Sequence, residues 1–265
     1  MFLKLRPLLY SLIFLIGLEA IVLEHKYVLI VVFFLFIISL YQGKRVGGKW
    51  KFSVLPVFFT LSSVALLYLI TLNYEQQTFI LLTSSMYYLS LFGAYRLNQY
   101  GGDQTARGMN MAATISTIFF TYAGAYGLYL NFLVPLWWLM IIYLIVTALV
   151  SYQYFSIIYF SNNSVKNVNN KPADVKDKIK QRKMVLVYSF LIALAMVEII
   201  WTISFWPFGY LTAGIIALIL YYVLWDLIQS HFLNLLSKRR MIANLIFFSF
   251  AIALILISSR WMPVV

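Results

Sequence analysis

The chain has 265 residues, of which 63% are hydrophobic and 11% are charged, and its formal net charge is +12. Soluble domains carry about a quarter charged residues and about half apolar ones, so this composition excludes a soluble globular protein. The apolar runs have helical length and lack the alternating pattern of an outer-membrane barrel, which predicts an all-α polytopic membrane bundle. Because the sequence contains no cysteine, disulfides, thiolate metal sites and cysteine nucleophiles are excluded.

Nine apolar segments follow one another along the chain. They cover roughly Leu8–Leu23, Tyr27–Tyr41, Phe52–Leu72, Thr78–Leu97, Met111–Leu130, Leu133–Phe160, Met184–Trp206, Phe208–Leu236 and Met241–Ser259. A helix needs about 20 residues to cross the hydrocarbon core, so the first two segments are short and the sequence leaves open whether both span. We expect a single integral membrane domain over residues 1–265.

The basic residues segregate to one side when the nine segments are treated as nine spans with a cytoplasmic N-terminus. The residues on that side are Lys4, Arg6, Lys44, Arg45, Lys49, Lys51, Arg96, Arg107, Lys166, Lys171, Lys176, Lys178, Lys180, Arg182, Lys183, Lys238, Arg239 and Arg240. Only Lys26 and Arg260 fall on the outer side. Because a miscounted helix would invert every later loop, this predicts nine spans with the C-terminus outside the cytoplasmic (plasma) membrane. The same rule explains the net charge, so no nucleic-acid partner is expected.

The N-terminus resembles a signal peptide, because Lys4 and Arg6 precede the apolar stretch Leu8–Leu18. The sequence Leu18-Glu19-Ala20, however, lacks the small-x-small pattern of a cleavage site. We therefore expect this stretch to be retained as the first helix.

The fourth and fifth segments are the least lipid-like. On the fourth, Thr83, Tyr87 and Ser90 recur at i, i+4 and i+7, so they share one helix face. On the fifth, small residues recur at every fourth position from Ala113 to Ala125, a pattern that lets helix backbones approach closely. Two interpretations stay open: a packed helix pair in the interior, or a polar cavity lined by Thr83, Tyr87 and Ser90.

Two loops on the predicted cytoplasmic side stand out. Residues 98–108 combine glycines with flanking arginines but match no phosphate-binding fingerprint, which favours a simple connection. The longest loop, residues 161–183, is basic, and a helix is expected to begin near Pro172 with Val175 and Ile179 on one face. Such a segment would attract anionic phospholipid at the cytoplasmic face, by about 1 kcal/mol per basic residue. The same charge also serves as a topology signal.

Two carboxylates, Glu198 and Asp226, lie inside apolar segments. A carboxylate in hydrocarbon costs about 2.5–3.5 kcal/mol on insertion scales, so each needs a physical explanation. The two segments run in opposite directions, and a rise of about 1.5 Å per residue separates the carboxylates by about 10 Å in height. A proton-sharing dyad is therefore not expected.

Each carboxylate has polar neighbours on its own helix face. Thr202 follows Glu198 at i+4, whereas Tyr222 and Gln229 flank Asp226 at i−4 and i+3. For both acids the alternatives are a structural hydrogen bond or a proton or substrate site. Glu198 is the stronger functional candidate, and Asp226 the stronger structural one.

Motifs for catalysis and cofactor binding are not found in the sequence. The two histidines, His25 and His231, have no acidic ligands at metal-binding spacing. No nucleophile elbow and no zinc-protease motif is present. We expect no metal and no cofactor, and the pattern favours a protein that is not an enzyme.

The C-terminal third combines Trp206-Pro207-Phe208-Gly209, a long aromatic helix, Lys238-Arg239-Arg240 and Arg260-Trp261. Over roughly residues 184–265 this layout resembles a family of small, uncharacterised multi-pass bacterial membrane proteins. The resemblance implies a topology and no activity.

Three hypotheses follow for the function. The first is a non-enzymatic accessory or envelope-associated membrane component, with a membrane protein as a possible partner. The second is a small-solute or proton-coupled transporter that uses Glu198. The third, an intramembrane lipid-modifying enzyme, has the least support in the sequence.

Overall fold

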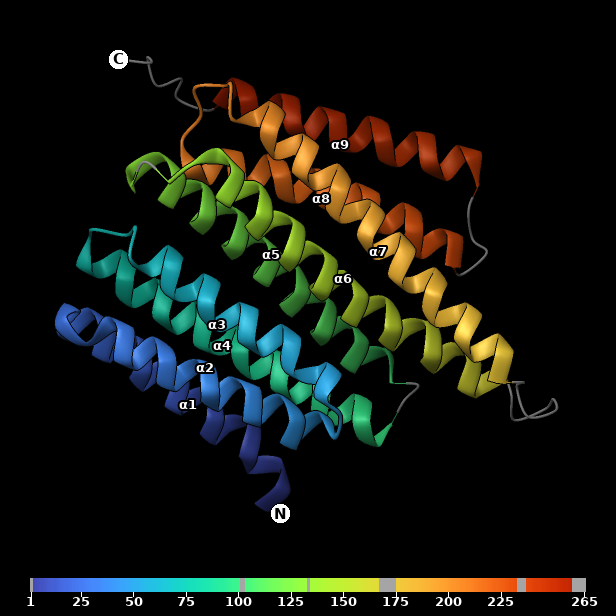
Figure 1. Ribbon diagram of the computed structural model, residues 1–265, viewed down its shortest axis with the longest axis horizontal. Coiled ribbons are helices and arrows are strands. Elements are labelled where there is room, and N and C mark those ends of the chain that lie inside the picture. Colours follow the sequence, from blue (N-terminus) through green and yellow to red (C-terminus); the bar gives the residue numbers. More distant parts are fainter. Residues whose placement is uncertain (1, 101–102, 133, 167–174, 233–236, 259–265) are drawn as a thin grey trace. The chain divides into compact units, whose positions relative to one another are not determined.

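The computed structural model describes residues 2–100, 103–132, 134–166, 175–232 and 237–258, and these residues form nine α-helices and two short 3-10 helices (Figure 1). In order they are α1 (Phe2–Leu23), η1 (His25–Tyr27), α2 (Val28–Gly47), η2 (Trp50–Ser53), α3 (Val54–Leu67), α4 (Asn73–Gln99), α5 (Gln104–Phe132), α6 (Leu136–Lys166), α7 (Val175–Ile203), α8 (Tyr210–Phe232) and α9 (Lys238–Ser258). The all-α prediction is confirmed, since each apolar segment of the sequence corresponds to one α-helix in the same order.

Seven segments of the described chain are long and apolar enough to cross a membrane: α1, α2, η2 with α3, α6, α7, α8 and α9. The two segments that were short in the sequence are among them, because α1 and α2 extend to 22 and 20 residues. Helices α4 and α5 are longer, at 27 and 29 residues, but their many polar residues keep them outside this set. The protein is thus a multi-pass integral membrane protein with seven candidate spans.

The chain divides into two compact units, Met1–Thr121 and Tyr122–Val265, and the boundary falls inside α5. The first unit holds α1 to α4 and the beginning of α5. The second holds the end of α5 and α6 to α9. The single integral membrane domain expected from the sequence stays a prediction.

Aromatic side chains from four helices form the core of the first unit. Phe14 of α1 stacks on Tyr87 of α4 with ring centroids 4.4 Å apart. Phe59 of α3 contacts the Tyr87 ring at 5.8 Å and Phe120 of α5 at 5.5 Å. All four side chains are buried, and such pairs each contribute about 0.5–1.5 kcal/mol beyond their buried area. The unit is therefore held together near the middle of its helices.

Gly48 makes the turn that leads out of α2 in the first unit. Its φ of 70° lies in the left-handed region, which glycine adopts without steric cost. A Cβ at this position would also lie 2.8 Å from the Asn98 side-chain nitrogen. The turn brings the Lys44 ammonium over the Trp50 ring, 4.3 Å from its centroid.

Tyrosines form the core of the second unit. Tyr122 of α5 stacks on Tyr143 of α6 at 4.1 Å, and the Tyr143 hydroxyl donates to the Tyr122 carbonyl oxygen (3.0 Å). The Tyr122 hydroxyl is hydrogen-bonded to that of Thr147 (2.7 Å), and Ser151 and Tyr221 of α8 form a similar pair (3.1 Å). Each of these buried hydroxyls has a hydrogen-bond partner, and together the contacts join α5, α6 and α8.

Helices α5 and α8 approach closely where Gly214 faces Ala123. A Cβ on Gly214 would lie 2.8 Å from the Ala123 Cβ and 2.9 Å from its Cα, so only glycine fits. The threonines of the predicted small-residue pattern bond within α5: Thr117 donates to the Ala113 carbonyl oxygen and Thr121 to that of Thr117. Close packing of α5 thus depends on its small side chains, and these two hydroxyls stay within the helix.

Helix α7 begins earlier than the apolar pattern indicates. It starts at Val175 and runs without a break to Ile203, so the basic residues before Met184 form its first turns. No glycine or proline interrupts this stretch, and Lys, Arg and Gln are good helix formers. Residues 167–174 of the basic loop, with Pro172, lie outside the described residues.

Candidate functional site

Glu198 lies within the apolar span of α7, residues Arg182–Ile203, and its side chain is exposed. Thr202 donates its hydroxyl to the main-chain carbonyl oxygen of Glu198 (2.9 Å), and not to the carboxylate. Within the part of the chain that the structure describes, the Glu198 carboxylate forms no hydrogen bond and no ion pair. An exposed, unpaired acid therefore interrupts an otherwise apolar surface.

The exposed side chains around Glu198 follow a regular pattern along α7. Val187, Leu191, Leu194 and Trp201 are between 41% and 51% exposed. With Glu198 they alternate at intervals of four and three residues, which is the spacing of a coiled-coil contact line. We call Val187, Leu191, Leu194, Glu198 and Trp201 the α7 seam.

Asp226 of α8 is half-buried and faces α9. The Asn244 side-chain nitrogen of α9 donates to one carboxylate oxygen of Asp226 at 2.7 Å. One turn earlier on α8, the Tyr222 ring packs against the rings of Trp225 (5.4 Å) and Phe248 of α9 (5.3 Å). The predicted polar face of α8 therefore includes a contact with α9, and Asp226 has a partner within the chain.

Trp225 and Gln229, one turn apart on α8, carry buried polar atoms without a hydrogen-bond partner among the described residues: the indole nitrogen and the amide oxygen. Trp225 is 3% exposed and packs against Tyr154 of α6, with ring centroids 5.0 Å apart. A buried polar group left unpaired costs about 1–3 kcal/mol. One donor and one acceptor are thus unsatisfied beside Asp226.

Thr83, Tyr87 and Ser90 of α4 are buried in the first unit, each at most 1% exposed. The Tyr87 hydroxyl donates to the side-chain oxygen of Gln42 on α2 (2.7 Å). Thr83 donates its hydroxyl to the Phe79 carbonyl oxygen in its own helix (2.8 Å). The structure thus brings this face of α4 against its neighbours, and its role as a cavity lining stays a prediction.

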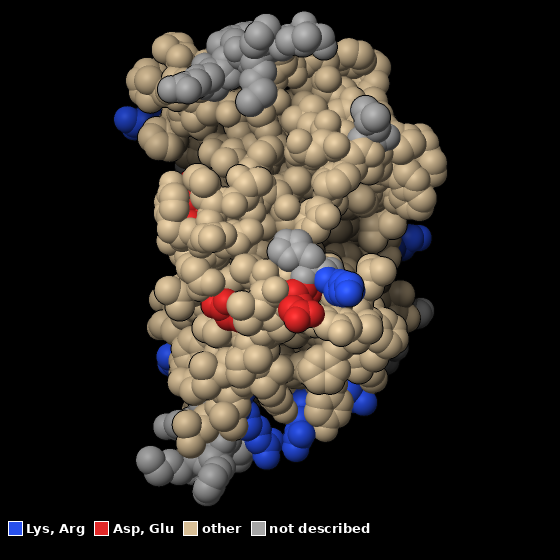
Figure 2. All heavy atoms as spheres, turned by 90° about the vertical axis from the view of Figure 1, so that its left-hand side faces the viewer, with Lys and Arg blue, Asp and Glu red and all other residues tan. Residues whose placement is uncertain are grey.

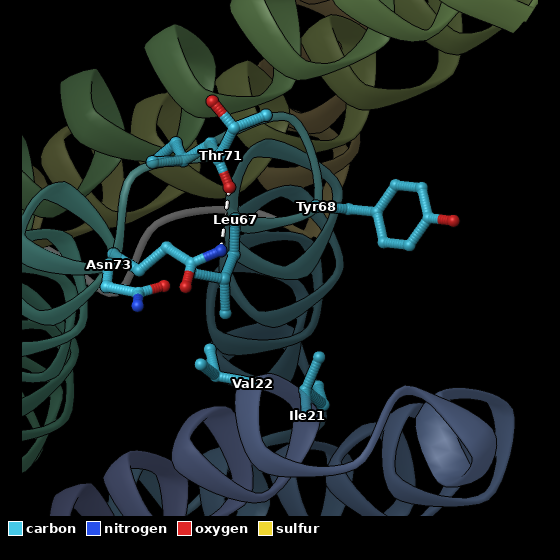
Figure 3. A pocket seen from close by; sticks show the side chains of 8 residues that line it. Ile21, Val22, Leu67, Tyr68, Thr71 and Asn73 are labelled. Atoms are coloured by element: carbon cyan, nitrogen blue, oxygen red, sulfur yellow. Dashed lines mark hydrogen bonds between the residues drawn. The ribbon is translucent and has the colours of Figure 1, made fainter.

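Three of the cavities formed by the described residues are lined by no candidate residue from the sequence. One, of about 440 Å³, lies where α1 and α3 end and α4 begins (Figure 3). There Gln76 donates to the Ile70 carbonyl oxygen (2.7 Å), and the Tyr68 ring points away from the other labelled side chains. A second lies between α1 and α4, and a third, of about 360 Å³, at the turn between α5 and α6.

No group of His, Asp and Glu side chains that could hold a metal ion is present in the described residues. His231 contacts the Tyr188 hydroxyl through Nε2 at 3.2 Å, which links the end of α8 to α7. Most of the surface drawn in Figure 2 is uncharged, as expected for a protein embedded in lipid.

Two amide side chains that make important contacts were not among the candidates from the sequence. Asn244 pairs with Asp226, and Gln42 pairs with Tyr87. Both are isolated amides in or beside long apolar segments, and this isolation is a usable signal. An uncharged polar residue in a membrane helix is expected to face another helix.

Residues 176–258 match the model of a family described as a protein of unknown function, DUF5656. The matched segment holds almost all of α7 and the whole of α8 and α9, and so includes Glu198, Asp226 and Asn244. The resemblance inferred for the C-terminal third is confirmed. Searches of curated proteins and of solved structures give no match. Since the family carries no known activity, the function has to be argued from the residues themselves.

Proposed function

We propose that this protein is a non-enzymatic accessory, envelope-associated component of the cytoplasmic membrane that binds another membrane protein through the α7 seam. The observation that supports this is the exposed, unpaired carboxylate of Glu198 within an apolar span. Leucine side chains on a helix face are suited to lipid, so they need no partner. A carboxylate there costs about 2.5–3.5 kcal/mol, and a protein partner can remove this cost.

The partner is a transmembrane helix with a Lys, Arg, Asn or Gln side chain at the depth of Glu198. Such a side chain donates a hydrogen bond to the carboxylate, and contacts of this kind stabilise helix pairs by about 1–2 kcal/mol in model peptides. The alternating spacing of the seam favours a left-handed crossing of about 20°, in which Leu194 and Trp201 pack on either side of the polar pair.

The alternative function is a small-solute or proton-coupled transporter that uses Glu198. A carrier needs a polar cavity that reaches its proton-binding carboxylate. The three cavities described above are lined by other residues, and Glu198 lies on an exposed face. The exposed position of Glu198 supports the accessory function over transport.

The topology belongs to the same proposal: nine spans, a cytoplasmic N-terminus and an outer C-terminus. Helices α4 and α5 are included as spans because much of their polar surface is shielded from lipid. Thr83, Tyr87 and Ser90 of α4 and Thr117 of α5 are all at most 1% exposed. A reporter fused at Val265 is expected to give an outer-side signal, and a cytoplasmic signal would refute the nine spans.

Anionic phospholipid at the cytoplasmic face is the second proposed partner. The first turns of α7, residues 175–181, continue directly into the apolar span Arg182–Ile203, and this continuity supports a lipid contact at that end of the helix. At the end of α2, exposed Lys44 lies over the ring of Trp50, which is 61% exposed, and exposed Arg45 contacts Tyr41. Basic and aromatic side chains at a span end are typical of an interfacial anchor.

Affinity purification from native membranes, with Glu198 variants, tests the proposed function. Glu198→Leu removes the polar group and is expected to abolish co-purification of the partner. Glu198→Gln keeps the size and an acceptor oxygen and is expected to retain part of the binding. Leu186→Ala, at an exposed position off the seam, is the matched control and should bind normally.

The same variants separate the two functions. A transporter would lose its pH-dependent uptake in Glu198→Gln, because the amide does not titrate. If Glu198→Gln abolishes uptake of a solute while all variants co-purify the same proteins, the accessory proposal is wrong.

A further inference from the structure

The turn that joins α2 to η2 in the first unit is rich in basic residues. It connects two candidate spans, Val28–Gly47 and Trp50–Leu67, and a turn between spans is expected at the level of the lipid headgroups. Three basic side chains and one aromatic ring are exposed there. We call these four residues the basic turn: Lys44, Arg45, Lys49 and Trp50.

The cations of the basic turn differ from a neighbouring arginine in their ionic partners. Arg96, near the end of α4, forms an ion pair with Asp103 (2.6 Å). The end of α4 lies against the turn, because a Cβ on Gly48 would be 2.8 Å from the Asn98 side-chain nitrogen. The three cations of the basic turn, in contrast, form no ion pair with any described residue. The turn therefore carries three charges that the described part of the chain does not neutralise.

The two chain segments that carry these cations pack directly against each other. A Cβ on Gly43 would lie 2.4 Å from the Ser53 Cα, and a Cβ on Gly47 would lie 2.4 Å from the Phe52 Cβ. The Ser53 hydroxyl also donates to the Leu40 carbonyl oxygen of α2 (2.9 Å). The end of α2 and the residues after the turn are thus joined by backbone contacts, which hold the basic residues of both segments near one another.

Aromatic rings order two of the three cations. The Lys44 ammonium lies 4.3 Å from the centroid of the Trp50 ring, and Trp50 follows Lys49 in the sequence. The Arg45 guanidinium donates to the Tyr41 hydroxyl (3.1 Å). Side chains that are already ordered in the free protein lose less conformational entropy when a ligand binds. Exposed aromatic rings at a span end also favour the membrane–water interface, so the turn suits a phosphate that belongs to a lipid.

We propose that the basic turn binds the headgroup of a phospholipid that carries two phosphates, such as cardiolipin. Lys44 and Lys49 bind one phosphate beside Trp50, and Arg45 donates to the second phosphate through its planar guanidinium. A headgroup with a single phosphate would leave either the two lysines or Arg45 without an anion. This inference rests on the anionic-lipid part of the proposed function, and it adds the lipid class and the binding site.

Native mass spectrometry of the full chain, delipidated in detergent and titrated with single lipids, tests the site. Cardiolipin is expected to bind at least about 5-fold more tightly than phosphatidylglycerol at equal phosphate concentration, which corresponds to one additional basic contact. Phosphatidylcholine, which has no net charge, gives the background. Inorganic diphosphate at the same phosphate concentration should not displace cardiolipin, because it lacks the apolar part of the lipid.

Variants of the basic turn locate the binding. Lys44→Gln/Lys49→Gln is expected to weaken cardiolipin binding by about 30-fold, or about 5-fold for each lysine. Lys44→Arg/Lys49→Arg keeps both charges and should bind as the parent protein does. The matched control is Lys238→Gln/Arg239→Gln, which removes two exposed charges at the start of α9 and should leave this binding unchanged. Because all the substituted side chains are exposed, the variants are expected to unfold at about the parent temperature.

The possible failures are distinguishable. Equal binding of cardiolipin and phosphatidylglycerol would overturn the two-phosphate headgroup and leave the anionic-lipid partner in place. Binding of either lipid at the level of phosphatidylcholine would refute that part of the proposed function as well. Equal weakening by the α9 control would overturn the location of the site, and displacement by inorganic diphosphate would show a site for free phosphate and not for a lipid.

Discussion

Helices α7 and α8 each carry one carboxylate within an apolar span, and the two acids have opposite surroundings. Asp226 is half-buried and accepts a hydrogen bond from Asn244 of the neighbouring helix. Glu198 is exposed, and within the described chain its carboxylate has no partner. The comparison shows an acid with a donor within the chain, Asp226, beside an acid for which we propose a donor from another protein, Glu198.

The rotation of each helix about its axis accounts for the difference. Tyr222 and Asp226 lie on the face of α8 that packs on α9, where Phe248 and Asn244 complete the contact. On α7, the buried residues Ala193, Met196 and Ile200 turn the opposite face inward and leave Glu198 outside. The variants below are ordered from the largest expected effect on stability to the smallest.

Asn244→Leu is expected to lower the free energy of unfolding most, by about 1.5–3 kcal/mol. The substitution removes the donor from a carboxylate that is partly shielded from water. Thermal unfolding of the purified protein in detergent measures this. The double variant Asp226→Leu/Asn244→Leu should recover most of the stability, since neither polar group is then left unpaired. Equal instability of the single and double variants would show that the two side chains are not coupled.

Asp226→Leu alone is expected to cost less, about 0.5–1.5 kcal/mol, because the group left unpaired is then a neutral amide. The same unfolding measurement applies, with Asp226→Asn as the conservative control that keeps an acceptor oxygen. A loss greater than that of Asn244→Leu would contradict this interpretation of the pair.

Glu198→Leu is expected to change the stability of the protein in the opposite direction. Without a partner in the chain to lose, the isolated protein should unfold at the parent temperature or above it. A loss of more than about 1 kcal/mol would mean that Glu198 is stabilised within its own chain, and the contrast with Asp226 would then fail.

Thr202→Val is expected to have the smallest effect, within about 0.5 kcal/mol. The Thr202 hydroxyl only returns to the carbonyl oxygen of Glu198 in its own helix, so the carboxylate is unaffected. Co-purification of the partner should also be unchanged, and its loss would place Thr202 in the contact.

Sequence patterns predicted the fold well and the surroundings of the candidate residues less well. The order of the nine helices follows from the apolar runs, because a helix that crosses a bilayer needs about 20 predominantly apolar residues. The sequence also placed Tyr222 and Asp226 on one face of α8, and both side chains contact α9. Neither the Asn244 contact nor the exposure of Glu198 could be predicted from the sequence, because both depend on which helices become neighbours. Periodicity within one helix contains no such information.

Site-specific photocrosslinking along α7 in native membranes tests the central claim most directly. Benzoylphenylalanine at Val187, Leu191, Leu194 or Trp201 is expected to crosslink one partner protein, whereas the exposed off-seam position Leu186 and Leu29 of α2 should not. Glu198→Leu should abolish the crosslinks from all four seam positions. Crosslinks with no dependence on seam position or on Glu198, or a product with the mass of two copies of this chain, would contradict the proposed function.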